Sequence, residues 1–131
     1  MVFSTATKIE IYDRVVDEHG NNTSELRPNQ LEGFRLEVAH LDHTRNDNYD
    51  NPDNGLLVTS LDHYAHHLLF MKRPRLIGLS KPHNQFAIQE TCKRAEQDAF
   101  RAGWNETRFR KELKKSTLLW INRLGIRFIE S

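Results

Sequence analysis

The pattern of apolar and polar side chains predicts two short strands joined by a long loop. Apolar and polar residues alternate along 31–41 (LEGFRLEVAHL) with the period of two that is typical of a half-buried strand. A second strand is predicted at 55–59 by the short apolar run GLLVT. The residues between them include TRNDNYDNPDN at 44–54, whose Asn, Asp and Pro favour turns. We therefore expect a strand, a long loop and a second strand.

Helical periodicity dominates the second half of the chain. Ser60 can cap a helix that begins at Leu61 and stops near Pro74. Two further helices are predicted from about His83 to Arg101 and from about Asn105 to Leu124, each with a glycine shortly after it. The expected fold class is α+β, a hairpin and a helix with additional C-terminal helices.

The two ends of the chain are less clear in sequence. Residues 7–20 (TKIEIYDRVVDEHG) place apolar side chains at helical spacing before a glycine, but their Ile, Tyr and Val content also suits a strand. Residues 21–30 are turn and loop material. The segment IRFIE at 126–130 is either a short strand or an extended tail.

Composition indicates a single globular domain spanning 1–131. The chain has 131 residues, 37% of them hydrophobic and 28% charged, which is typical of globular proteins and not of disordered or membrane proteins. No apolar run approaches the roughly 20 residues of a membrane span, and the N-terminus lacks the pattern of a signal peptide, so we expect a cytoplasmic protein without a membrane partner. The lone Cys92 excludes an internal disulfide and a cysteine zinc site.

The formal net charge of +1 hides a strong asymmetry. Residues 1–71 contain 5 Lys and Arg against 12 Asp and Glu, whereas residues 72–131 contain 14 against 6. A basic half beside an acidic half rich in His is expected of a module that grips a polyanion with one part and holds cations with the other. The alternative is a helical surface with solvated charges.

Five of the seven histidines lie between Ala39 and His67. Residues four apart share one face of a helix, so His63 and His67 can bind one cation. Alternation along a strand places His40 and Asp42 on one side of the first strand. A hairpin that folds back against the helix would bring both sets together.

These residues carry a resemblance to a known family. The stretch from about Leu36 to Leu69, a quarter of the chain, resembles the HNH endonuclease motif, the ββα-metal fold, with a loop similar to that of phage and intron-type members. In that family a strand bears the catalytic His, an Asn precedes the second strand, and the next helix supplies metal-binding His residues. Here His40 lies fourteen residues before Asn54, His63 lies nine after it, and His67 lies four further on.

The resemblance implies a ββα-metal core at about 34–71 with a basic helical part at about 82–124, and hydrolysis of DNA phosphodiester bonds. His40 would take a proton from the attacking water and would be oriented by a hydrogen bond to Asn54. A divalent ion would be held by His63 and His67, together with Asp42. Magnesium prefers oxygen ligands, whereas an imidazole-rich shell favours nickel, zinc or manganese, so the identity of the ion is open.

Two departures from the family pattern leave alternatives open. Members often carry a His or Asp ligand immediately before the catalytic His, and that position is Ala39. Asp42 or His43 could substitute, or Asp42 and His43 could themselves form the pair of ligand and base. The cysteine pairs that hold a structural zinc in many members are also absent, so burial by the C-terminal helices would replace that support. A non-cleaving DNA-binding or assembly protein on the same fold is therefore the alternative function, ahead of a plain zinc-binding module.

Further expectations concern side chains that are not in the proposed catalytic and metal-binding set. His66 lies one residue off the metal-binding face and is expected to face solvent or to contact phosphate. A homodimer would supply the two active sites that cutting both strands requires. The stripe of Phe109, Leu113 and Trp120 is expected to be buried. The candidate DNA contacts on the last helix, where a solvated basic face would look the same, are Arg108, Lys111, Lys114 and Lys115.

Overall fold

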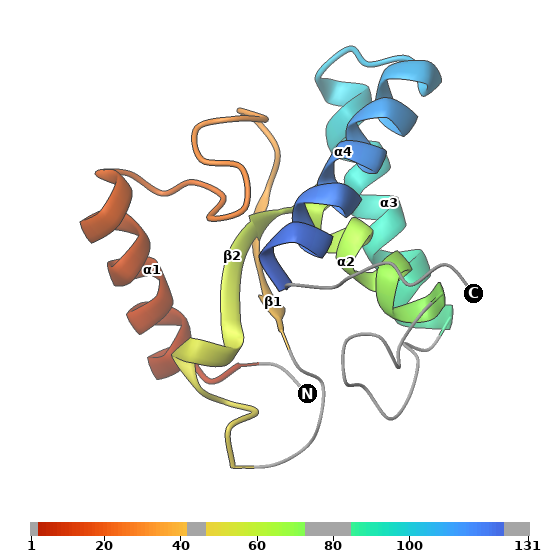
Figure 1. Cartoon of the computed structure of the whole chain (residues 1–131). Coiled ribbons are helices and arrows are strands. Elements are labelled where there is room, and N and C mark those ends of the chain that lie inside the picture. Colours follow the sequence, from red (N-terminus) through yellow and green to blue (C-terminus); the bar gives the residue numbers. More distant parts are fainter. Residues whose placement is uncertain (1–2, 42–46, 73–84, 125–131) are drawn as a thin grey trace.

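The chain is α+β, as predicted, with a two-stranded antiparallel hairpin and four α-helices in the described residues (Figure 1). This computed structural model describes residues 3–41, 47–72 and 85–124. No helix within these ranges has the length and apolar composition needed to cross a membrane. The elements, in order, are α1 (Thr5–His19), β1 (Leu36–His40), the 3₁₀ turn η1 (Pro52–Asn54), β2 (Gly55–Thr59), α2 (Ser60–Lys72), α3 (Gln85–Arg101) and α4 (Glu106–Leu124).

Both predicted strands form, and they pair with Leu36 opposite Thr59 and His40 opposite Gly55. The second strand has the predicted limits of 55–59, whereas the first begins five residues later than predicted. The reason is a turn: Leu31 and Gly33 have φ angles of 56° and 88°. Such left-handed backbone cannot join an extended ladder, so pairing starts after it.

The ambiguous N-terminal segment is a helix, which covers one face of the hairpin. Its first turn is capped by Ser4, whose hydroxyl accepts from the Thr7 N–H at 3.2 Å. Its end is Gly20, in the left-handed region at φ 79°. Ile11 and Val15 of α1 are fully buried in a cluster with Leu57 of β2. A two-stranded hairpin alone is only marginally stable in water, and α1 covers one of its two faces.

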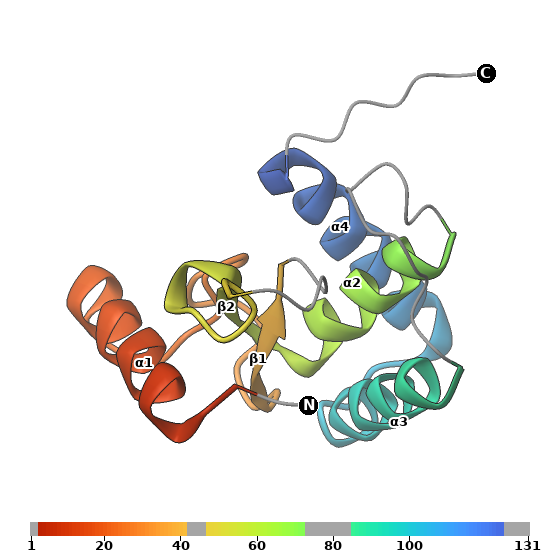
Figure 2. The ribbon, with the colours of Figure 1, turned by 90° about the horizontal axis from the view of Figure 1, so that it is seen from below.

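The other face of the hairpin packs on α2, with α3 and α4 beyond it (Figure 2). Leu56 and Val58 point away from α1 and join a buried cluster with Ala65 of α2 and Trp120 of α4. All five residues of β2 are buried, because neighbouring side chains face helices on opposite sides. The predicted start of α3 at His83 lies outside the described residues, as does the tail at 126–130.

The outer edge of β2 is covered by Glu25, through both its backbone N–H and its side chain. The Glu25 N–H donates to the Leu57 carbonyl at 2.7 Å, and the Leu57 N–H donates to Glu25 Oε1 at 3.0 Å. Arg14 of α1 pairs with Glu25 and also donates to the carbonyls of Pro52 and Gly55 at 2.9 and 3.0 Å. One ion pair therefore fastens α1, the loop and the strand edge together.

A fully buried carboxyl group, that of Asp62, joins α2 to α4 and to the loop after α1. Its two oxygens accept from the hydroxyls of Ser24 at 3.0 Å and Ser116 at 2.6 Å. The indole of Trp120 donates to the Asp62 carbonyl at 2.7 Å. Arg27, only 2% exposed, donates to the Ser116 hydroxyl and pairs with Glu112. Each polar group in this buried network has a partner, which is the condition for burying it.

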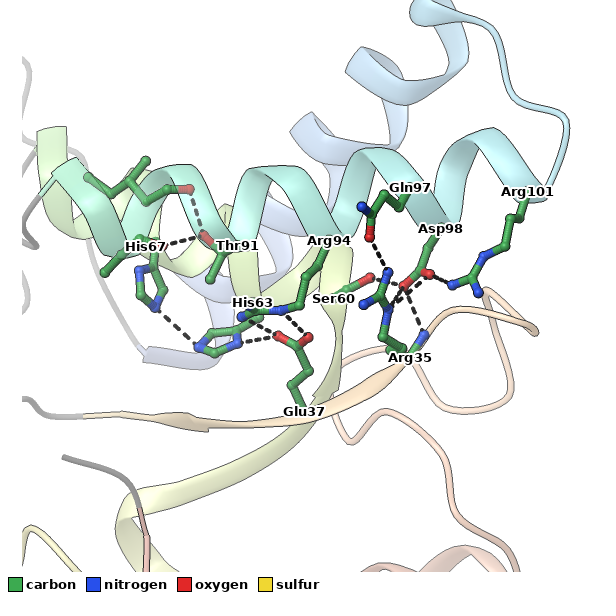
Figure 3. Close-up of polar contacts among 12 residues, drawn as sticks. Arg35, Glu37, Ser60, His63, His67, Thr91, Arg94, Gln97, Asp98 and Arg101 are labelled. Carbon is green, nitrogen blue, oxygen red and sulfur yellow. Dashed lines mark hydrogen bonds and ion pairs between the residues drawn. The ribbon is translucent and has the colours of Figure 1, made fainter.

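A second buried carboxyl group, that of Asp98, ties α3 to the start of α2 (Figure 3). It accepts from the Ser60 hydroxyl at 2.6 Å and from the Arg35 N–H at 3.0 Å, and it pairs with the side chains of Arg35 and Arg101. The Ser60 N–H in turn donates to the Arg35 carbonyl. The first turn of α2 is thus held from both sides, by Asp62 toward α4 and by Asp98 toward α3.

Replacing Asp62 by Ala should destabilise the fold by about 2–4 kcal/mol, because the substitution leaves two buried hydroxyls without their acceptor and opens a cavity. Urea unfolding followed by far-UV circular dichroism measures the change. Asp13→Ala, at an exposed position of α1, removes the same group from the surface and should change the free energy of unfolding by less than about 0.5 kcal/mol. Equal effects of the two substitutions would contradict the account of the buried network.

Candidate active site

The two histidines predicted to share a cation lie together on α2. The Nε2 atoms of His63 and His67 are 3.1 Å apart, and the ring planes meet at 77° (Figure 3). One helical turn separates the residues, so both rings leave the same face of the helix. The side chain of His63 is 15% exposed and His67 is 6% exposed, so the pair sits at the edge of the core.

The pair is extended by two residues that the sequence analysis did not select. Glu37 of β1 lies 2.7 Å from His63 Nδ1 through its Oε1. Arg94 of α3 donates to the same carboxylate twice, from Nε to Oε2 at 2.6 Å and from Nη2 to Oε1 at 3.1 Å. The cluster therefore combines side chains from β1, α2 and α3 (Figure 3).

The environment of Glu37 keeps it ionised at neutral pH. Burial raises the pKa of its carboxyl group, but the hydrogen bonds from His63 and Arg94 outweigh burial and lower the pKa to about 2. A carboxylate only accepts, so His63 Nδ1 carries the hydrogen of that contact. In the neutral ring the lone pair is then on Nε2, the atom that faces His67.

The two imidazoles share a hydrogen bond between their Nε2 atoms, and the same spacing suits a pair of metal ligands. Zinc–nitrogen bonds of about 2.0–2.1 Å at a tetrahedral angle place two ligand nitrogens about 3.3 Å apart, close to the 3.1 Å between these Nε2 atoms. In the part of the chain that the structure describes, no group of three or more His, Cys, Asp or Glu side chains is arranged to hold a metal ion. The predicted ligand Asp42 and the alternative residue His43 lie outside the described residues.

The expectation that the hairpin brings His40 together with His63 and His67 is wrong: His40 ends β1 on the face toward α1, whereas the histidine pair lies on the face toward α2. Its ring is stacked between Phe3, at 3.7 Å between centroids and 8° between planes, and Tyr49, at 4.1 Å and 17°. Only 7% of the residue is exposed. Stacking covers both faces of the imidazole and fixes its plane, while the two ring nitrogens lie at its edge.

Asn54 closes the loop that supplies Tyr49. Its carbonyl accepts from the Leu41 N–H at 2.8 Å, and its side-chain amide donates to the Tyr49 carbonyl at 3.0 Å. The amide therefore helps to place one of the two rings that stack on His40. The direct hydrogen bond between His40 and Asn54 stays a prediction.

The expected position of His66 is wrong. The residue is fully buried, and its ring lies 4.5 Å from that of Trp120. It is covered because α4 packs over this side of α2, which the sequence of α2 alone does not indicate. The stripe on α4 is confirmed at Trp120, which is fully buried, while Phe109 and Leu113 are partly buried.

The four candidate DNA contacts are exposed on α4, away from the histidine pair. Ala65 and Leu69 of α2 share the buried cluster of α4. At about 100° per residue these two positions point roughly opposite to His63 and His67. The structure thus does not bring the cations of α4 together with the histidine pair. These cations are Arg108, Lys111, Lys114 and Lys115.

Comparisons of the chain with protein-family models, with curated proteins and with solved structures give no match.

Gly55 of β2 pairs with His40 of β1 and lies beside Ile11 of α1. A Cβ atom there would lie 2.5 Å from Ile11 Cδ1 and 3.1 Å from Phe3 Cζ. Gly55→Ala should therefore cost about 1–3 kcal/mol of stability through overpacking. It should also displace Phe3 and shift the ring-proton resonances of His40 in NMR spectra.

Gly103→Ala is the matched control, because its Cβ would meet nothing within 4 Å although its φ of 77° carries backbone strain. This control should lower stability without moving the His40 resonances. Unchanged His40 resonances in Gly55→Ala would contradict the packing described for Phe3.

Proposed function

We propose that this protein is a metal-dependent endonuclease of the HNH type that hydrolyses phosphodiester bonds in DNA, with its ββα-metal core formed by β1, β2 and α2. The observation that carries the proposal is the 3.1 Å approach of the His63 and His67 Nε2 atoms. It occurs on the helix that follows a hairpin whose first strand ends in His40. Hairpin, loop Asn and helical His pair stand in the order that the HNH motif requires.

His40 is the proposed catalytic base. Its neutral imidazole accepts a proton from the water that attacks phosphorus. Phe3 and Tyr49 hold the ring plane during this step, so the accepting nitrogen keeps its direction. A divalent ion held by His63 and His67 would supply stabilisation of the negative charge that develops on the phosphate and on the leaving oxygen.

Asp50 provides charge near the base. The pKa of its carboxyl group is lowered by a hydrogen bond from the Ser4 N–H, by one from Thr7 and, to a smaller extent, by the charge of His40. Because Asp50 is exposed, solvent screens its charge, and its effect on the imidazolium that His40 becomes is small.

The second candidate function is binding of DNA without cleavage on the same fold. Ala39 motivates it, because this residue occupies the usual ligand position, is fully buried and has no ligand atom. The nuclease and the non-cleaving protein would share the fold and differ in the number of side chains that hold the divalent metal ion. The same experiment tests both.

In that experiment, supercoiled plasmid is incubated with the full chain and magnesium, manganese, nickel or zinc in turn, beside an EDTA control. We expect metal-dependent nicking that EDTA abolishes and that His40→Ala lowers by roughly 10²- to 10⁴-fold. His19→Ala, which changes a histidine at the end of α1, should leave the rate unchanged.

Intact plasmid with every metal, together with a gel shift of DNA, would overturn the nuclease and favour the non-cleaving protein. Intact plasmid without a gel shift would overturn both candidate functions.

A further inference from the structure

We propose that Glu37, clamped by Arg94, is a positioning residue that fixes the His63 ring for a nitrogen-preferring divalent cation such as zinc or nickel. The inference rests on the metal site of the proposed function. It concerns two residues that the HNH resemblance did not select. Its evidence is the geometry around one carboxylate that touches both His63 and Arg94.

The first step is the contact between strand and helix. Glu37 Oε1 lies 2.7 Å from His63 Nδ1, a length typical of a strong hydrogen bond to a carboxylate. Ligand histidines almost always donate their second ring N–H in this way, which fixes both tautomer and ring orientation. With Nδ1 thus engaged, His63 presents Nε2, the atom 3.1 Å from His67 Nε2.

The second step is the clamp on the carboxylate. Arg94 donates to both oxygens of Glu37, so the guanidinium holds the carboxylate in a forked contact. One of these oxygens is the atom that touches His63. Glu37 is therefore held in its contact with His63 and acts on the cation through that ring, without being a ligand itself.

The third step is the place of Glu37 on β1. Residues two apart on a strand share a face, so Glu37 and Ala39 both point toward α2. Ala39 is fully buried and packs in the cluster with Ala65. β1 thus places a carboxylate beside His63 at position 37. In the family pattern the same strand carries a direct metal ligand, which would be at position 39. A shell built from two imidazoles suits zinc or nickel better than magnesium, which prefers oxygen.

Calorimetric titration of the full chain with Zn²⁺ tests the proposal. We expect one site in the wild type, its loss in His63→Ala, and an affinity about 10- to 100-fold weaker in Glu37→Gln. Arg94→Lys keeps the charge but loses the fork, and should weaken binding by a smaller factor. Glu90→Gln is the matched control: Glu90 also lies near Arg94 and acts on it through charge alone, and its variant should bind as the wild type does.

A second measurement separates positioning from folding. Long-range ¹H–¹⁵N NMR of the metal-free protein should show His63 protonated at Nδ1 in the wild type and a mixture of tautomers in Glu37→Gln. Far-UV circular dichroism of the same samples checks that the variant is folded. A merely structural ion pair would leave the tautomer unchanged.

Zn²⁺ affinity and His63 tautomer both unchanged in Glu37→Gln would overturn this inference and leave the proposed nuclease intact. Failure of the wild type to bind Zn²⁺ would overturn the inference as well. Plasmid nicking is scored separately: Zn²⁺ binding that depends on Glu37, without nicking under any metal, would overturn the nuclease while supporting the role of Glu37.

Discussion

A hairpin of two strands is only marginally stable in water by itself, and the packing of the other elements here follows from the need to cover it. Each face of the hairpin has its own helical cover, α1 on one side and α2 on the other. The free edge of β2 is closed by Glu25, which Arg14 holds in place. The strands can therefore be short and still well defined.

The same arrangement divides the candidate site between the two faces. His40 lies on the side of α1, between Phe3 and Tyr49. Glu37 lies on the side of α2, where it reaches His63. Odd- and even-numbered positions of β1 thus face different helices, and a shift of one residue in the register would turn each side chain to the other face.

Buried carboxyl groups set the orientation of α2, and with it the direction of the histidine pair. Asp62 and Asp98 are at most 1% exposed, and each is satisfied by donors from other elements. A rotation of α2 about its axis would break both sets of hydrogen bonds and leave buried groups unpaired, which is costly. The helix is therefore restrained at its first turn, the turn that carries His63.

Local patterns in the sequence predict the features that depend on local chemistry. The limits of β2 follow from a bounded apolar run, and the spacing of His63 and His67 follows from the helical period. The composition of residues 7–20 suits a helix or a strand, and the cap at Ser4 and the packing on Leu57 decide for the helix. Tertiary context decides there between two structures that propensity allows.

The missed features depend on contacts between distant segments. Glu37 and Arg94 are 57 residues apart, and nothing in either local sequence indicates that they meet. His66 was misplaced because its burial is due to Trp120 of α4. The basic half of the chain contains both α3 and α4, and the arginine that reaches the histidine cluster comes from α3 and not from the predicted contacts on α4.

The central claim is that His63 and His67 hold one divalent cation through their Nε2 atoms. Crystals grown with Zn²⁺ and measured on both sides of the zinc absorption edge test it most directly. We expect a single anomalous peak about 2.0–2.1 Å from both Nε2 atoms, with Glu37 still on His63 Nδ1. Zinc bound elsewhere, or no anomalous peak while the two rings remain in contact, would contradict the account.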